Sequence, residues 1–211
     1  MGILELRMAP RVFLLSPANL GGRRAAQALS PKATFALAAA LRSADGAPLG
    51  DLFTFVSGLY FRGKLAYAGA FAQPPAGVEG VFVITPDDGL RPADEPVGLP
   101  RLRRFAAGDI DAANPRYSAP LRRDAERLAA ALSPDCELVL LGSVATGKYV
   151  DVLVPVLGDR LRFPSAFVGR GDMSRGGLML RCVRDAQELE YVPVAGAIRH
   201  GGRPPRLAPL A

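Results

Sequence analysis

The chain has 211 residues, of which 49% are hydrophobic and 22% are charged, and its formal net charge is +6. These values are typical of a globular protein. Its two cysteines and one histidine exclude zinc sites built from four Cys or His ligands and dense disulfide frameworks, and they argue against a Ser-His-Asp or Cys-His nucleophile.

In the N-terminal half of the chain, apolar runs typical of buried strands alternate with helical patterns. The predicted elements are, in chain order, a strand at 12–15, helices at 23–29, 33–42 and 62–72, and a strand at 81–84. The helix at 62–72 ends a long apolar stretch that begins at residue 52. We expect the Pro-rich segment 90–100 to be irregular.

The same alternation continues in the C-terminal half. The predicted elements are an amphipathic helix at 119–132, a strand at 137–141, a helix at 149–157, and strands at 160–163 and 190–194. Residues 142–148 and 169–177 are predicted as loops, and residues 178–183 fit either a helix or a strand.

Strands separated by helical patterns predict an α/β fold with a mostly parallel central sheet and helices on both faces. We expect residues 1–195 to form one domain and residues 196–211 to form a poorly packed basic tail of Gly, Pro and Arg. No apolar run has the length of a membrane span, and the N-terminus lacks a signal-peptide core, which predicts a cytoplasmic protein with reduced thiols. Ligands of such sheets bind beyond the carboxyl ends of the strands.

The loop at 142–148 follows an apolar strand and opens a helix, as a phosphate-binding loop does. It matches Gly-x-x-x-x-Gly-Lys, but Tyr149 replaces the Ser or Thr that would bind Mg²⁺, which argues against a P-loop NTPase. We expect an anion-binding turn, and the alternative is a tight connection with its lysine in water. The candidate contacts are Gly142, Ser143, Thr146, Gly147 and Lys148.

The loop after the first strand carries a similar set of residues. Ser16 and Asn19 are candidates for capping or hydrogen bonding, and Gly21 and Gly22 would let the backbone approach a ligand. A purely structural loop is equally consistent with these residues.

The loop at 169–177 holds Arg170 and Arg175 among four glycines, which suits recognition of a phosphate or carboxylate by guanidinium groups. The alternative is a solvated turn in which Asp172 or Ser174 caps a helix. All three loops are expected to lie at the same edge of the sheet.

Carboxylates near these loops are the candidates for acid–base catalysis, namely Asp87, Asp88 and Asp172. Asp109 and Asp111 face the same way if their segment is extended, where they would hold a divalent cation or transfer protons; otherwise they form a turn and a helix cap. An ordinary surface ion pair with Lys148 explains Asp151.

Aromatic and basic residues are combined in the segment 57–67. Tyr60 and Tyr67 are seven residues apart, so they share a helical face and could stack a base beside Arg62 or Lys64; the alternative is that both rings belong to the core. The chain has only three lysines among 26 basic residues, so the net charge by itself is a weak sign of nucleic-acid binding. Where such a chain retains a lysine, as at Lys64 and Lys148, we look for a specific role.

The middle of the chain resembles a small bacterial domain related to the peroxide-stress YaaA-like proteins. In that group a Leu-Tyr helix precedes a strand, and a Gly-Leu turn leads into a segment with Pro and acidic residues; the corresponding segments here are 59–67, 81–85 and 89–97. Residues 85–88, Thr-Pro-Asp-Asp, depart from the His-containing turn of that pattern. The resemblance covers about half of the chain and implies an α/β fold and a connection with nucleotides or nucleic acids, without assigning catalytic residues.

The sequence therefore predicts a protein that binds a phosphate- or nucleobase-bearing small molecule, such as a nucleotide, at the carboxyl edge of its sheet. An enzyme with these residues would catalyse hydrolysis or transfer at a nucleotide or glycosidic centre, and no particular cofactor is indicated. The alternatives are a non-enzymatic module that binds DNA or RNA through its arginine surface, and a scaffold for another protein.

Overall fold

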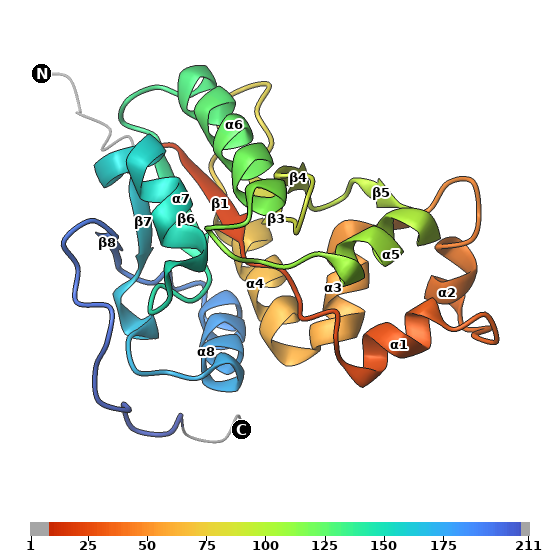
Figure 1. Cartoon of the computed structure of the whole chain (residues 1–211). Coiled ribbons are helices and arrows are strands. Elements are labelled where there is room, and N and C mark those ends of the chain that lie inside the picture. The colour runs from red at the N-terminus through yellow and green to blue at the C-terminus, as the bar shows by residue number, and fades with distance from the viewer. Residues whose placement is uncertain (1–8, 208–211) are drawn as a thin grey trace, which may run out of the picture.

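The structure is a computed structural model that describes residues 9–207, so the outermost parts of the predicted domain and tail, residues 1–8 and 208–211, lie outside the described residues. A six-stranded sheet of order β4-β3-β1-β6-β7-β8 forms its centre (Figure 1). Four neighbouring strands are parallel, namely β3 (Val81–Ile84), β1 (Arg11–Leu15), β6 (Glu137–Leu141) and β7 (Leu161–Pro164). The edge strands β4 (Leu90–Pro92) and β8 (Tyr191–Pro193) are antiparallel to their neighbours.

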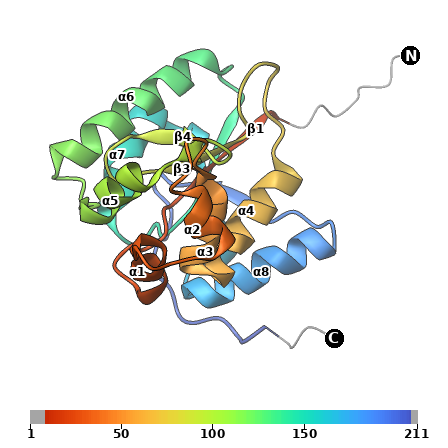
Figure 2. The same cartoon turned by 90° about the vertical axis from the view of Figure 1, so that its right-hand side faces the viewer.

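Helices cover both faces of this sheet, as predicted. They are α1 (Arg23–Leu29), α2 (Ala36–Ala40), α3 (Leu49–Ser57), α4 (Leu59–Phe71), α5 (Leu99–Ala107), α6 (Pro115–Ala131), α7 (Gly147–Leu157) and α8 (Asp172–Arg184). Two short 3₁₀ turns, η1 (Gly158–Arg160) and η2 (Ser165–Phe167), flank β7. Figure 2 shows α6 and α7 on one side of the sheet and α4 and α8 on the other.

The alternating side chains of β1 explain this arrangement. Phe13 and Leu15 pack into an apolar cluster with residues of α3, α4 and α8, whereas Val12 and Leu14 pack into a second cluster with residues of α6 and α7. All four side chains are fully buried. A central parallel strand is covered on both faces, which is why its sequence is a continuous apolar run.

The segment 52–71 forms two helices and not one. Gly58 adopts a φ of +62°, in the left-handed region that favours glycine, so α3 ends there and α4 begins at Leu59. Helix α6 begins earlier than predicted because Asn114 caps it by accepting the N–H of Arg116 and Pro115 occupies its first position.

Two other sequence expectations were wrong. The segment 90–100 is not irregular, because β4 pairs with β3 and β5 (Pro96–Val97) pairs with β2 (Ala47–Pro48). The loop predicted at 169–177 ends at Gly171, because α8 begins at Asp172 and continues as a helix through 178–183. Proline and glycine content is a poor guide here because edge strands and first helical turns tolerate both residues.

The order of the strands creates a crevice at one edge of the sheet. The chain runs from β1 to β3 on one side and later places β6 on the other side of β1. The connections that leave β1 and β6 therefore diverge, which is the topological switch point where α/β proteins bind ligands. Helices α1, α2, α3 and α5 gather beyond this edge, at the right of Figure 1.

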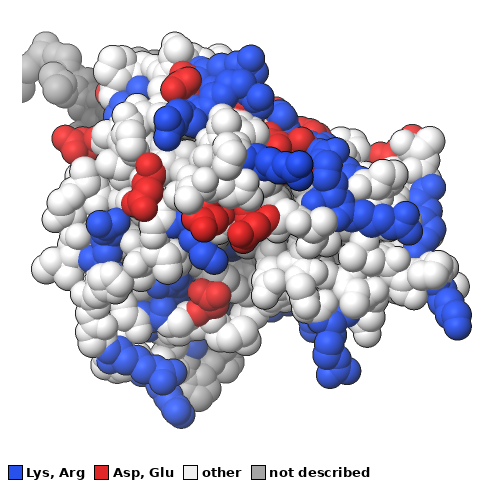
Figure 3. Space-filling model, in the orientation of Figure 1, with Lys and Arg blue, Asp and Glu red and all other residues white. Residues whose placement is uncertain are grey.

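The predicted basic tail has no helix or strand between residues 196 and 207, and most of these residues are exposed. On the face of the molecule shown in Figure 3, basic side chains are interspersed with acidic ones. Arg101, for example, forms ion pairs with Asp88 and Glu95, at 2.6 and 2.5 Å. The net charge of +6 is therefore not gathered on one purely basic face in this view.

Helices α4 and α8 approach each other closely through two glycines. A methyl group on Gly63 would lie 2.7 Å from the carbonyl oxygen of Gly176, and one on Gly176 would lie 2.8 Å from the carbonyl oxygen of Leu59. Backbone atoms on both sides leave no room for a side chain. This contact brings the N-terminal turns of the two helices together at the edge of the sheet.

We predict that Gly63→Ala lowers the free energy of unfolding by about 2 kcal/mol, because the new methyl group forces the two helices apart. Gly69→Ala is the matched control in the same helix, since Gly69 is exposed and a methyl group there has no atom within 4 Å. That substitution should be neutral or stabilise the protein by up to about 1 kcal/mol. Urea denaturation measures both, and equal effects of the two variants would contradict a close helix contact.

Candidate functional site

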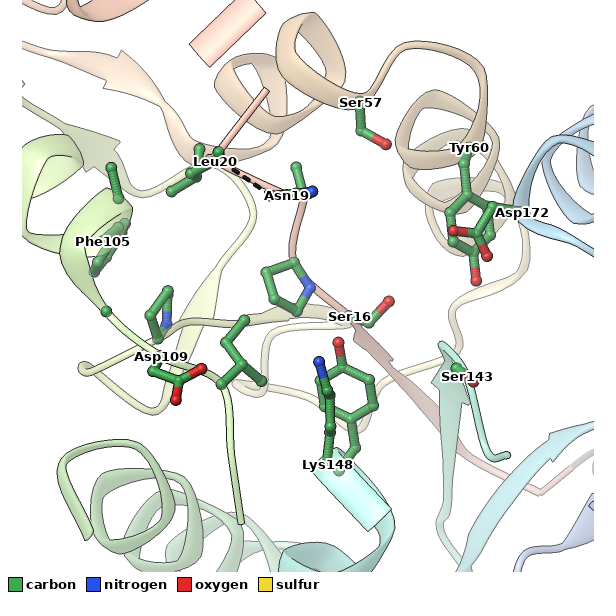
Figure 4. Close-up of a pocket in the computed structure, with 18 residues that line it drawn as sticks. Ser16, Asn19, Leu20, Ser57, Tyr60, Phe105, Asp109, Ser143, Lys148 and Asp172 are labelled. Atoms are coloured by element: carbon green, nitrogen blue, oxygen red, sulfur yellow. Dashed lines mark hydrogen bonds between the residues drawn. The ribbon is translucent and has the colours of Figure 1, made fainter. Parts of the chain in front are cut away.

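A cavity of about 550 Å³ lies at the switch point, between the carboxyl edge of the sheet and the helices beyond it (Figure 4). Residues 16–21 after β1, the turn and first residues of α7 after β6, and the start of α8 all contribute to its lining. The ends of α3 and α5 and the segment 108–110 close the other side. The three loops therefore meet at one edge of the sheet, as predicted.

Seven of the predicted site residues line this cavity together, namely Ser16, Asn19, Gly21, Tyr60, Ser143, Lys148 and Asp172. The other predicted residues lie outside the lining, namely Gly22, Lys64, Asp87, Asp88, Gly142, Thr146, Gly147, Arg170 and Arg175. Several of the second group nevertheless position the first.

Lys64 is the central member of that second group. It is 1% exposed, and its Nζ donates to the carbonyl oxygen of Ser16 and, at 2.9 Å, to the Ser16 Oγ. The same Nζ lies 4.5 Å from the ring centre of Tyr60 and 4.7 Å from that of Phe61. Lys64 therefore lies directly behind Ser16 and outside the lining of the cavity, whereas the sequence had suggested a place in the lining itself.

Burial lowers the pKa of Lys64 to about 7, because an ammonium group loses most of its hydration there. The negative charge of Asp172 opposes this change, and the positive charge of Arg175 adds to it. A substantial fraction of the Lys64 side chain is consequently a neutral amine near neutral pH, with a lone pair that can accept a proton.

The Tyr60 hydroxyl is buried at the wall of the cavity, near the side chains of Ser16 and Arg175, but it makes no hydrogen bond of good geometry with a described residue. Burial raises the pKa of Tyr60 to about 12, and the charge of Arg175 acts in the opposite direction. The hydroxyl therefore remains a neutral donor. Because buried polar groups are nearly always paired, this unpaired group is the sort of atom that a bound ligand satisfies.

Tyr67 has a different role from Tyr60. Its ring is fully buried and lies edge-on to Phe13, and its hydroxyl is 2.6 Å from that of Tyr191 and accepts the Leu189 N–H at 2.8 Å. Of the two interpretations left open by the sequence, the core interpretation holds for Tyr67, which has no face available to stack on a base.

Two arginines, Arg175 in α8 and Arg170 before it, fix the start of this helix. The guanidinium of Arg175 is buried and donates to the carbonyl oxygen of Phe167 at 3.3 and 3.1 Å, and it lies 3.6 Å from the Asp172 carboxylate. Arg170 donates to the carbonyl oxygen of Ala166 at 3.0 Å. Both arginines hold the turn before α8, and this leaves the exposed carboxylate of Asp172 at the cavity.

The glycine loop after β6 is shaped by its neighbours. A side chain at Gly142 would lie 2.9 Å from the Ser16 Cβ, and one at Gly147 would lie 2.0 Å from the Asp151 carboxylate. Lys148 is exposed and lines the cavity, and the expected ion pair between Asp151 and Lys148 does not occur among the ion pairs of residues 9–207. Thr146 precedes α7 but makes no capping hydrogen bond through its side chain.

The acidic candidates near β3 are engaged elsewhere. Asp88 accepts from Arg101 and Arg104, each at 2.6 Å, and Asp87 accepts from Arg104 at 2.6 Å. These ion pairs hold α5 against the turn between β3 and β4. Neither carboxylate lines the cavity, so a catalytic role for the pair has no geometric support there.

Asp109 and Asp111 also separate in the structure. Asp109 lines the cavity, whereas Asp111 accepts the backbone N–H of Ala113 at 3.0 Å and so stabilises a turn. Within residues 9–207 no three side chains among His, Cys, Asp and Glu come together in a way that would hold a metal ion. The described helices include none that is long and apolar enough to cross a membrane.

No protein-family model, curated protein or solved structure matches this chain. The resemblance to YaaA-like proteins therefore stays a prediction. The pairing of Ser16 with Lys64 is the feature that sequence reasoning missed. Its one available signal was a lysine retained on an apolar helix of an arginine-rich chain, since lysine can lose its proton when buried and arginine cannot.

We predict that the free energy of unfolding rises by about 1 kcal/mol per pH unit between about pH 7 and pH 10 through Lys64 alone. The pKa of Lys64 falls from 10.5 when exposed to about 7 in the folded protein, so the unfolded chain binds the extra proton in this range. Raising the pH removes that advantage of the unfolded state.

The contribution is measured as the difference in unfolding free energy between wild type and Lys64→Met across this pH range, which cancels the titration of other groups. Lys148→Met, at an exposed position, serves as the control and should leave the pH dependence unchanged. A difference between wild type and Lys64→Met that is independent of pH would contradict a buried lysine with a lowered pKa.

Proposed function

We propose that the cavity at the switch point binds a small molecule that carries a phosphate group and a hydroxylated sugar, such as a mononucleotide. The unpaired, buried hydroxyl of Tyr60 at the wall of the cavity is the observation that carries this proposal. The cavity has a volume of about 550 Å³, which lies within the range of about 300–1,000 Å³ typical of small-molecule sites.

The charges around the cavity fit the two parts of such a ligand. Lys148 and the free backbone N–H groups at the start of α7 would bind the phosphate, since the N-terminus of a helix favours an anion. The carboxylates of Asp109 and Asp172 would accept hydrogen bonds from sugar hydroxyls. Figure 4 shows Asp109 on one side of the cavity and Asp172, beside Tyr60, on the other side.

Binding of nucleic acid through the arginine surface has weaker support. Arg101 and Arg104 on α5 already pair with carboxylates, and so do Arg123 and Arg127 on α6, which contact Asp124. Phosphates of a nucleic acid would have to compete with these ion pairs. Binding to DNA or RNA that falls steeply with salt and does not depend on base sequence would support this alternative.

We predict that the protein binds a nucleoside monophosphate or inorganic phosphate in calorimetric titration, and that Tyr60→Phe weakens this binding about 5- to 10-fold. The same substitution should leave the free protein as stable as wild type, because no hydrogen bond is lost in the absence of ligand. Tyr67→Phe is the matched control, since it removes a paired hydroxyl outside the cavity and should lower stability without changing binding.

A second pair of variants tests the phosphate contact in the same titration. Lys148→Met should weaken binding about 10-fold, whereas Lys32→Met, at an exposed lysine outside the cavity, should bind like wild type. Purified protein that retains a nucleotide would also absorb strongly in the band of the bases, because the chain has no Trp and five Tyr. The proposal fails if no monophosphate binds below about 1 mM, or if Tyr60→Phe and Lys148→Met bind like wild type.

A further inference from the structure

Ser16 occupies the position where β1 ends and its loop begins. The backbone N–H of Ser16 donates to the carbonyl oxygen of Leu141 at 3.1 Å, and its carbonyl oxygen accepts from Lys64, so the residue is held from both sides. Only 4% of Ser16 is exposed, yet it lines the cavity, and Figure 4 shows its hydroxyl directed into the space between the labelled residues. Its hydroxyl is therefore fixed beside any molecule bound there.

Lys64 lacks the partners of a structural buried lysine. A buried ammonium group is normally paired with a carboxylate, because an unpaired charge is expensive to remove from water. The polar atoms bonded to the Lys64 Nζ within residues 9–207 are the two oxygens of Ser16. A neutral amine fits this environment better, since it can accept the proton of the Ser16 hydroxyl.

We propose that Ser16 and Lys64 act as nucleophile and general base, and that the cavity takes a carboxylic ester whose acyl group is transferred to the Ser16 hydroxyl. The geometry that carries the proposal is the 2.9 Å contact between the Lys64 Nζ and the Ser16 Oγ at the wall of the cavity. Serine activated by lysine is an established variant of nucleophilic catalysis. The inference uses the cavity of the proposed function but does not need a phosphate on the ligand.

The reaction balances with water as the only co-reactant. The Ser16 Oγ attacks the ester carbonyl carbon and passes its proton to the Lys64 Nζ, which returns that proton to the departing alcohol as the ester C–O bond breaks. Water then attacks the acyl-serine carbonyl carbon and gives a proton to Lys64, which returns it to the Ser16 Oγ as the carboxylic acid leaves. The net reaction converts ester and water into acid and alcohol.

The Tyr60 hydroxyl has the properties of a donor to the carbonyl oxygen as negative charge develops there. It is buried at the same wall, it makes no hydrogen bond of good geometry in the described part of the chain, and its ring contacts the Lys64 Nζ. Fixed donors of this kind stabilise the oxyanion of an acyl-transfer reaction.

The groups that face this pair from other elements set the pH at which it works. Asp172 and Arg175 of α8 act on Lys64 with opposite signs, and the Tyr149 hydroxyl of α7 lies near Ser16. Burial raises the pKa of Tyr149 to about 12, so both nearby tyrosines stay neutral when Lys64 titrates at about 7. The reactivity of Ser16 should accordingly rise with pH around neutrality, as Lys64 loses its proton.

A small alkyl fluorophosphonate tests the pair on the full chain without a known substrate. This probe reacts with an activated serine, whose oxygen displaces fluoride from phosphorus while the hydroxyl proton goes to the base. We expect peptide mass spectrometry to find the label on Ser16, with a rate that rises with pH around a midpoint of about 7. Ser16→Ala should abolish this label, and Lys64→Met should slow it at least 100-fold.

Ser57→Ala, on the wall of the same cavity, and Lys32→Met, at an exposed lysine outside it, are the matched controls, since neither residue has a role in the proposed site. Both variants should be labelled on Ser16 at the wild-type rate. Folded wild-type protein that stays unlabelled at Ser16, or a Ser16 rate that does not depend on pH between about 6 and 9, would overturn the proposal.

A thiol at the same position keeps the test decisive if Lys64→Met does not fold. In Ser16→Cys the introduced thiol should be alkylated by iodoacetamide at neutral pH at least 10-fold faster than Cys136 and Cys182, which are both buried. An introduced thiol that reacts no faster than these two would also overturn the proposal. Labelling of Ser16 without any binding of monophosphates would contradict the proposed function alone, and the reverse result would contradict this inference alone.

Discussion

The burial of one lysine against the end of the central strand is the interaction on which the site depends. Lys64 reaches from α4 to both oxygens of Ser16, which terminates β1 at the switch point of the sheet. This contact fixes the direction in which the chain leaves β1 and holds the Ser16 hydroxyl at the cavity. It also forces an ionisable group into a place with almost no water, which is what lowers the pKa of Lys64.

The surrounding fold makes that burial possible. Gly63, the neighbour of Lys64 in α4, lets α8 approach so closely that Asp172 and Arg175 act on the lysine from the second helix. Gly142 in turn leaves room for Ser16, because a side chain there would collide with the serine. Gly63 and Gly142 therefore leave the room that three polar side chains need. These side chains are Ser16, Asp172 and Arg175, and this role explains two glycines that do not line the cavity themselves.

Much of this fold follows from local sequence, and most of the site does not. Continuous apolar runs identified β1, β3 and β6, because parallel strands buried on both faces leave no other pattern. The loops after β1 and β6 could be assigned to one edge for the same reason.

In contrast, Ser16 and Lys64 are 48 residues apart, and no local pattern indicates that they touch. Asp87 and Asp88 looked available in the sequence, but the arginines that engage them come from a helix that packs onto their turn. Tyr60 and Tyr67 share a helical face, yet only packing against Tyr191 distinguishes the core ring from the one at the cavity.

The central claim is that Lys64 loses its proton near neutral pH, and lysine side-chain titration by NMR measures this directly. The chain has three lysines, so protein labelled with ¹³C on lysine gives few signals, and Lys64→Met identifies the one from Lys64. We predict that this signal shifts with a midpoint of about 7. A midpoint above about 9 for the same signal would contradict it, because Lys64 would then remain an ammonium group at neutral pH and could not act as a base toward Ser16.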